Sequence, residues 1–176
     1  MATTNLGGTL PTVNASSDTW GTENNTFLTI VDKYFAMFAA DNIGTPQNVS
    51  SGVAAYVTFG NEVLDTAGGF ASSTHTVPVG YAGKWEYKAN VSGAGTSGSL
   101  IRVEVQFWKN GALYRTVSTN GLAGTGSTGS KEGEVIVTMA EGDTMAVKGI
   151  VTASGTVTFD GTAPSFCSFS GRFLHT

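Results

Sequence analysis

Apolar and polar residues alternate along much of this chain after about residue 50. In residues 85–91, Trp85, Tyr87, Ala89 and Val91 alternate with polar side chains. A period of two residues is that of a β-strand with one apolar and one polar face. Residues 74–79 also alternate, and Gly80 and Gly83 follow directly. We therefore expect two tightly joined strands here, with further strands burying the Trp85 face, because an isolated hairpin is marginal in water.

Further strands are predicted at fairly even spacing along the rest of the chain. The candidates are residues 53–59, 63–64, 100–109, 112–119, 134–139, 144–151, 155–159 and 165–174. Asn110-Gly111 fits a two-residue type I′ hairpin. The glycine-rich stretches 92–99 and 120–133 are predicted loops. The pattern favours an all-β fold, an antiparallel jelly-roll sandwich of about eight to ten strands.

The apolar residues before this series follow a helical spacing instead. They are Phe27, Leu28, Val31, Tyr34, Phe35 and Phe38. This stripe predicts one amphipathic helix over residues 22–40, ended by Gly44 and Pro46. So many apolar groups are too large a patch to stay exposed on a monomer. The helix would pack on the jelly roll, on two sister helices or on a capsid.

A change of composition at residues 45–52 divides the chain into two parts. Residues 1–45 form an extended arm plus the helix, and residues 50–176 form the jelly roll. The arm is polar, and alone it would be disordered. Its most prominent residue is Trp20, a large aromatic beside Gly21. Trp20 either docks on a partner surface, which we favour, or folds back on its own helix.

Composition narrows the classes of function. Only 12% of the 176 residues are charged, whereas charged residues usually make up about 25% of a globular protein. The chain also contains 24 glycines. The net charge is −4 without a basic stripe, so nucleic acid is not an expected partner. No apolar run or signal sequence predicts membrane insertion or export, so we expect synthesis in the cytoplasm.

The residue types that carry chemistry are few. Two stretches match the pattern G-x-G-x-x-G, at residues 93–98 and 124–129, but predicted strands rather than helices follow them. His75 lies on an apolar strand face, and Cys167 in a Phe-rich strand; we interpret both as packed residues. No paired carboxylate stands in a coherent context. We expect no enzymatic activity, no cofactor and no metal site.

Three segments resemble the globular head domain of complement-type proteins, which is related to the tumour necrosis factor jelly roll. They are HTVPVGYAGKWEYKANV (75–91), VIVTMAEGD (135–143) and SFSGRFL (168–174). Arg172, inserted between Gly and Phe, and the loop at 121–129 depart from that pattern. The resemblance implies a ten-stranded jelly roll that forms a tight homotrimer without enzymatic activity. The residues expected in the core and the trimer are Tyr81, Trp85, Tyr87, Phe169 and Phe173.

The N-terminal part has a resemblance of its own. The segments LPTV (10–13), DTWGT (18–22) and NTFLTIVD (25–32) are similar to the anchor segment of bacteriophage fibre, head-fibre and decoration proteins. The resemblance implies that residues of the arm hold the virion. These are Leu10, Pro11, Val13, Trp20 and Gly21.

Together the two resemblances suggest a non-enzymatic structural protein of a phage virion. It would be a homotrimeric capsid decoration, head-knob or head-fibre protein, with the major capsid protein or another virion protein as its partner. The alternative is a short tail fibre or receptor-binding tip that recognises a host surface glycan or protein.

Overall fold

The computed structural model describes residues 35–42, 44, 46–96, 100–118, 128–161 and 167–175. Regular structure in these residues is β-strand, and none of them forms a helix that could span a membrane. The strands are β1 Met37–Asp41, β2 Gln47–Val49, β3 Ala55–Tyr56, β4 Asn61–Asp65, β5 Phe70–Ala71, β6 Thr74–Thr76, β7 Gly83–Gly95, β8 Leu100–Lys109, β9 Ala112–Ser118, β10 Thr128–Met139, β11 Thr144–Ala153, β12 Val157–Phe159 and β13 Ser168–His175.

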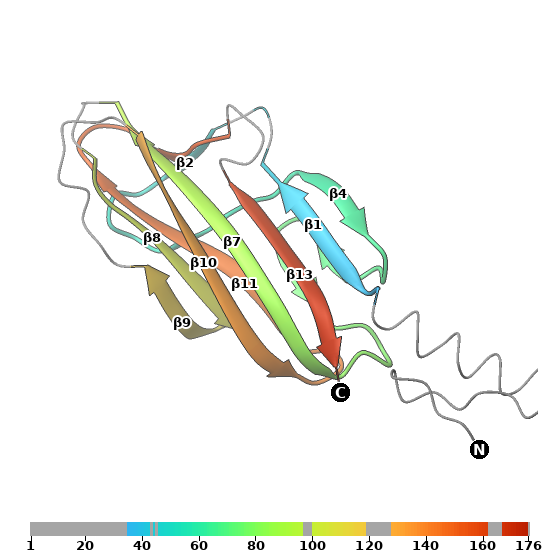
Figure 1. The fold of residues 1–176 in the computed structure, drawn as a ribbon. Helices are drawn as coiled ribbons and strands as arrows, with labels where there is room; N and C mark the ends of the chain where they lie inside the picture. Colours follow the sequence, from blue (N-terminus) through green and yellow to red (C-terminus); the bar gives the residue numbers. More distant parts are fainter. Residues whose placement is uncertain are drawn as a thin grey trace, which may run out of the picture.

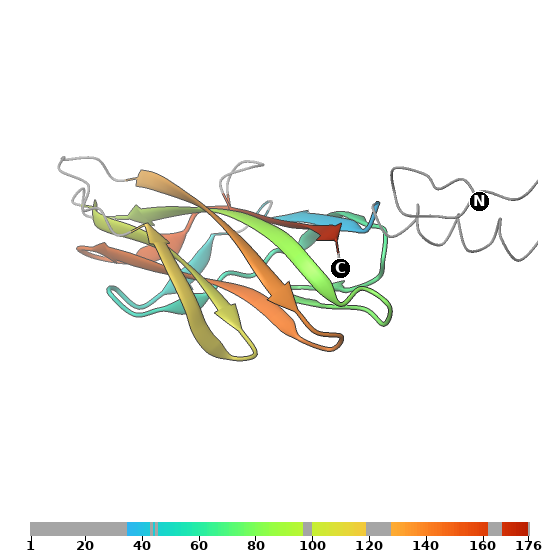
Figure 2. The same ribbon diagram turned by 60° about the horizontal axis from the view of Figure 1, so that its bottom comes forward.

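The strands form two antiparallel sheets packed face to face (Figures 1 and 2). We call the first the β7 sheet; its order is β2-β12-β7-β13-β1-β4, and β10 pairs with β7. The second, the β11 sheet, has the order β5-β6-β11-β8-β9, with β3 also paired to β11. The expected antiparallel sandwich is therefore confirmed, and each sheet has one face in the core and one face outside.

The core lies between the sheets and is built by the alternation seen in the sequence. Trp85 and Tyr87 on β7 and Phe107 on β8 are fully buried. The rings of Trp85 and Tyr87 belong to an aromatic cluster that also includes Phe38 and Phe169. Burying a large side chain contributes roughly 1.5–3 kcal/mol, so this cluster holds the two sheets together.

The prediction that residues 74–79 and 85–91 are neighbouring strands is wrong. β6 pairs with β11, whereas β7 belongs to the opposite sheet. His75 of β6 faces Trp85 of β7 across the core, with 4.6 Å between the ring centroids. The connection between them therefore crosses from one sheet to the other, and the Trp85 face is buried by this crossing.

The end of the predicted helix is also corrected. Residues 37–41 form β1, in which the buried Phe38 and Ala40 alternate with outward-facing neighbours. β1 lies between β13 and β4. Backbone pairing and the burial of Phe38 among other aromatic rings outweigh the helical spacing here. The jelly roll thus begins at Met37, before the boundary placed near residue 45; Phe35, in the preceding turn, is 62% exposed.

Two stretches predicted as glycine-rich loops are partly β-strand, and close packing explains the glycines of the first one. β7 continues to Gly95, and β10 begins at Thr128. A Cβ atom at Gly93 would lie 2.5 Å from the Val151 side chain, and one at Gly95 would lie 2.5 Å from Ala153 Cβ. Glycine is needed at these positions because the opposite sheet approaches closely. Gly93 and Gly95, the first two glycines of the first G-x-G-x-x-G match, therefore lie within a strand.

The predicted type I′ hairpin at residues 110–111 is confirmed. Asn110 and Gly111 have φ values of 51° and 75°, and both central residues of this turn type require a positive φ. The Asn110 side chain donates to Asp143, 2.8 Å away, in the turn before β11. This bond, with those from the Ala140 N–H and Lys109, lowers the pKa of Asp143 to about 2. The carboxylate thereby ties two turns together at one end of the sandwich.

We predict that Gly171→Ala destabilises the fold. A Cβ atom at this position of β13 would lie 2.9 Å from the Tyr87 ring and still closer to the ring of Phe38. Overpacking of this kind costs about 1–3 kcal/mol, measurable as the free energy of unfolding in urea. Gly60→Ala is the matched control, because nothing lies within 4 Å of its Cβ position. Equal stability of the two variants would contradict this account of the core.

Candidate functional site

The outer face of the β7 sheet is the candidate site. Strand register places its outward side chains in rows that cross the sheet. One row is Ile136, Glu86, Arg172 and Met37; the next is Glu134, Lys88, Ser170, Ala39 and Leu64; a third is Glu132, Asn90, Ser168 and Asp41. Residues from β10, β7, β13, β1 and β4 thus meet on one surface.

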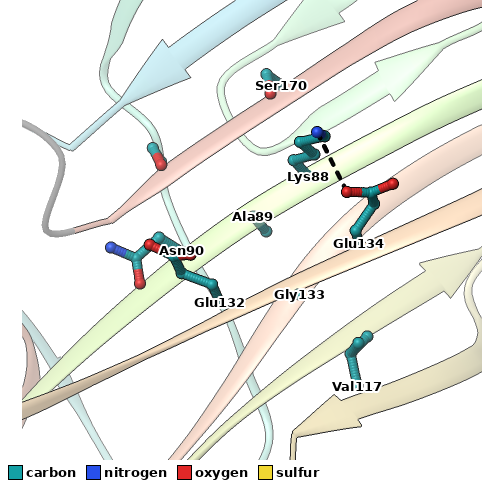
Figure 3. A pocket seen from close by; sticks show the side chains of 9 residues that line it. Lys88, Ala89, Asn90, Val117, Glu132, Gly133, Glu134 and Ser170 are labelled. Atoms are coloured by element: carbon teal, nitrogen blue, oxygen red, sulfur yellow. Dashed lines mark ion pairs between the residues drawn. The ribbon is translucent and has the colours of Figure 1, made fainter.

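Small side chains make this surface hollow (Figure 3). Ser168 and Ser170 of β13 lie beside the longer side chains of Asn90 and Lys88 on β7. They leave a hollow of about 620 Å³, lined also by Lys88, Glu132 and Glu134.

Four charged groups form a network at the edge of this hollow. Lys88 Nζ lies 3.2 Å from Glu134 and 3.7 Å from Glu86, and Arg172 donates to the Glu86 carboxylate. Glu86 is only 7% exposed. Its burial would raise the pKa of this carboxyl, but the hydrogen bond from Arg172 and the charges of Arg172 and Lys88 prevail and lower the pKa below its ordinary value. Glu86 is therefore held as a carboxylate.

A second hollow of about 320 Å³ continues the first toward β1 and β4. Its walls include Met37, Ala39 and Leu64, so the face becomes more apolar in this direction. Leu64 is 42% exposed, and Ile136 at the opposite edge of the sheet is 55% exposed. The face therefore has a charged centre and apolar margins.

The charged groups of this face lower the pKa of its buried carboxyl rather than raise it. General acids are expected to have raised pKa values, whereas that of Glu86 is lowered by its partners. In the part of the chain that the structure describes, no group of His, Cys, Asp or Glu residues could hold a metal ion.

The aromatic residues predicted for the core and the trimer do not lie on this face. Trp85, Tyr87, Phe169 and Phe173 are buried between the sheets. Tyr81 is partly buried, and its ring meets Phe173 edge-on at 6.0 Å while its carbonyl accepts from the Trp85 indole. The structure brings these five together as core.

The sequence pattern already placed the residues of the outer face on the polar side of predicted strands. Glu86, Lys88 and Asn90 alternate with the buried aromatics of β7, and Arg172 is the residue that departs from the complement-type closing pattern. Their meeting with β10, β13 and β1 depends on pairing across up to 135 positions of sequence, from Met37 to Arg172. Alternation alone does not reveal it.

The predicted anchor residues lie outside the described residues. This holds for Leu10, Pro11, Val13, Trp20 and Gly21, and for Phe27, Leu28, Val31 and Tyr34 of the predicted helix. Phe38 belongs to the core, as described above.

His75 and Cys167 are packed residues, as the sequence suggested. His75 is 1% exposed, its Nδ1 lies 2.9 Å from the Tyr87 hydroxyl, and its ring stacks on Phe38. Burial lowers the pKa of His75 from 6.5 to about 4, against a smaller opposing effect of Asp65. Cys167 is fully buried, and burial raises its pKa to about 11. Neither residue is poised as a nucleophile or base.

Comparison with known proteins identifies the fold. No protein-family model matches the sequence, and no curated protein matches it. Among solved structures, the globular domain of the zebrafish complement 1qA protein matches with a TM-score of 0.51 at 12% identity, covering 80% of this chain and 98% of that one. Murine APRIL matches with a TM-score of 0.53 at 12% identity over 79% and 98%. Eiger TNF from S. frugiperda matches with a TM-score of 0.54 at 12% identity over 80% and 92%. The chain shares the jelly-roll fold of complement-type and tumour-necrosis-factor-like domains.

We predict that His75 makes the protein less stable in acid. Because its folded pKa is about 4 and its unfolded pKa about 6.5, the unfolded chain binds more protons between these values. The stability contributed by neutral His75 is fully present above pH 6.5 and is lost as the pH falls toward 4. The free energy of unfolding decreases over this range by up to roughly 3 kcal/mol. Urea unfolding of the protein and of His75→Gln at pH 7, 5.5 and 4 measures this. A stability difference between the two that does not change with pH would refute it.

Proposed function

We propose that this chain is a non-enzymatic structural protein of a bacteriophage virion. Three copies associate through the outer face of the β7 sheet. The N-terminal residues hold the particle, where the protein resides after synthesis in the host cytoplasm, and the jelly-roll head projects as a capsid decoration, head knob or head fibre. The observation that supports association of copies is the hollowed outer face, built on a complement-type fold and flanked by exposed apolar residues at both margins.

The geometry of the face supports a ring of copies. A ring uses heterologous contacts, in which two different patches of the same surface meet. Leu64 at the β4 margin and Ile136 at the β10 margin are two such apolar patches on opposite sides of one face. The small Ser168, Ser170 and Ala39 between them leave room for a neighbouring chain. A low share of charged residues suits a surface covered by sister subunits.

The position of β1 supports attachment through the N-terminal residues. Met37 pairs with Arg172 near the end of β13, so the chain enters the sandwich at one end of the sheet (Figure 1). The role in the virion itself rests on the similarity of residues 10–32 to phage anchor segments. A short tail fibre or receptor-binding tip is the alternative, and copy number separates the two.

Ser170→Arg tests the trimer. We expect the full chain to have about three times its 18.1 kDa mass in light scattering coupled to size exclusion. We expect the variant to elute as a monomer, because the long new side chain fills the hollow that a neighbouring copy would enter. Thr76→Arg is the control, since Thr76 is exposed on the other sheet. A monomeric wild-type chain, or a trimeric Ser170→Arg variant, would contradict the proposed interface.

Removing residues 1–34 tests attachment. We expect the shortened chain to keep its fold and its trimeric mass, because β1 and the outer face remain, but to lose binding to purified virus particles that lack it. Sedimentation with particles measures the binding. Gel densitometry of intact virions should show hundreds of copies; a few tens or fewer would favour the tail-fibre alternative. Undiminished binding of the shortened chain would exclude the N-terminal residues as the anchor.

A further inference from the structure

The outer face of the β11 sheet carries a cation held between two aromatic rings. Lys148 of β11 pairs in register with Tyr56 of β3 on one side and with Gln106 of β8 on the other. Its Nζ lies 4.3 Å from the ring centroid of Tyr56 and 3.5 Å from that of Trp108. Both distances are in the range of cation–π attraction. The rings therefore fix the ammonium at one place on the sheet.

A chain of hydrogen bonds along β8 supports this arrangement. The Trp108 indole N–H donates to Gln106 Oε1 at 3.0 Å, and Gln106 Nε2 donates to Glu104 Oε1 at 2.6 Å. Arg102 pairs with the other oxygen of Glu104. Glu104 and Gln106 are 2% and 7% exposed. Alternate residues of one strand thus form a rigid polar ladder that orients the Trp108 ring.

The charges on this face do not cancel. Arg102 neutralises Glu104, whereas the ion pairs found in the described residues include none to Lys148. The π faces attract the ammonium but supply no formal negative charge. Lys148 is thus a positioned cation that can still bind an anion, on a chain whose net charge is −4.

A polar groove continues the face beyond Tyr56. The groove has a volume of about 560 Å³ and is lined by Gln47, Asn48, Ser50, Tyr56 and Thr58, among others. The Gln47 amide donates to the Tyr56 carbonyl at 2.7 Å and accepts from the Thr58 N–H at 3.0 Å. Tyr56 is therefore held in place although it is 44% exposed.

We propose that this face binds an acidic sugar, with the sugar carboxylate on Lys148 and the C–H face of the ring against Tyr56. The hydroxyl groups of neighbouring sugars would meet the amides and hydroxyls of the groove. Strands lie about 4.8 Å apart, so β3, β11 and β8 span the width of roughly two sugar rings. An acidic peptide fits less well, because β11 and β8 are paired on both edges here and offer no free backbone for strand addition.

This inference goes beyond the proposed function and does not depend on it. The trimer face belongs to the β7 sheet, and Lys148 lies on the outer face of the other sheet. Trimer mass and sugar binding are therefore measured separately, and one can fail while the other holds.

Trigalacturonic acid is the probe, and its methyl ester is the neutral twin with the same rings. Calorimetric titration of the full chain should show binding of the acid at micromolar to millimolar concentration, with at least tenfold weaker binding of the ester. Lys148→Gln, which keeps the chain length but removes the charge, should weaken binding about tenfold, and Tyr56→Ala should do the same. Lys131→Gln on β10 makes the same charge change elsewhere and should leave affinity unaltered.

Three results would overturn the proposal. The first is no binding of trigalacturonic acid at concentrations up to about 10 millimolar, roughly the weakest range in which such a contact is measurable. The second is that Lys148→Gln binds the acid as tightly as the unaltered chain. The third is that a heptaglutamate peptide binds as tightly as the acid, which would make the face a site for acidic peptides. Circular dichroism of each variant shows that it has folded. Tyr56→Ala is expected to fold, because the ring it removes is 44% exposed.

Discussion

The close approach of two sheets around a buried aromatic cluster is the constraint on which the structure depends. His75 lies at its centre, between Phe38 and Trp85, and it bonds to the Tyr87 hydroxyl. The cluster joins β1, β6, β7 and β13, strands that come from both sheets and from both ends of the described chain. Burial keeps the histidine neutral, so it adds no charge to the core. A Cβ atom at Gly93 would meet Val151 of the opposite sheet, and one at Gly171 would meet the rings of Phe38 and Tyr87 on the neighbouring strands.

With the core secured between the sheets, the two outer faces are free to differ. On the β7 sheet, small residues and a charge network around Glu86 make a hollow with apolar margins. On the β11 sheet, the strand partners of Lys148 place an ammonium between Tyr56 and Trp108. We propose the first face for contact with other copies of the chain and the second for a small anionic ligand. Each property follows from which side chains point outward, and neither requires any change to the core.

Glu86 and Glu134 on the β7 sheet are held in ion pairs, and His75 and Cys167 are buried in the core. If the two outer faces act as proposed, assembly and ligand binding occupy opposite sides of one sandwich, and the chain before β1 adds attachment at one end. A trimer would then present three copies of the Lys148 face outward, which raises the strength of binding to a polymer that carries many acidic sugars.

The sequence by itself determined the class of fold and most of the strands. Alternation at residues 85–91 and 100–109 and the Asn110-Gly111 turn are local signals, because a strand's two faces and a turn's φ values are set by neighbouring residues. It did not determine that β6 and β7 lie in opposite sheets, that Phe38 belongs to a strand, or that Gly93 lies within one. Those outcomes depend on partners distant in sequence: β11 for β6, Arg172 and Gly171 for β1, and Val151 for Gly93. The two outer faces were decided by tertiary structure alone, since strand pairing selects which polar residues become neighbours, and pairing is a property of the whole sandwich.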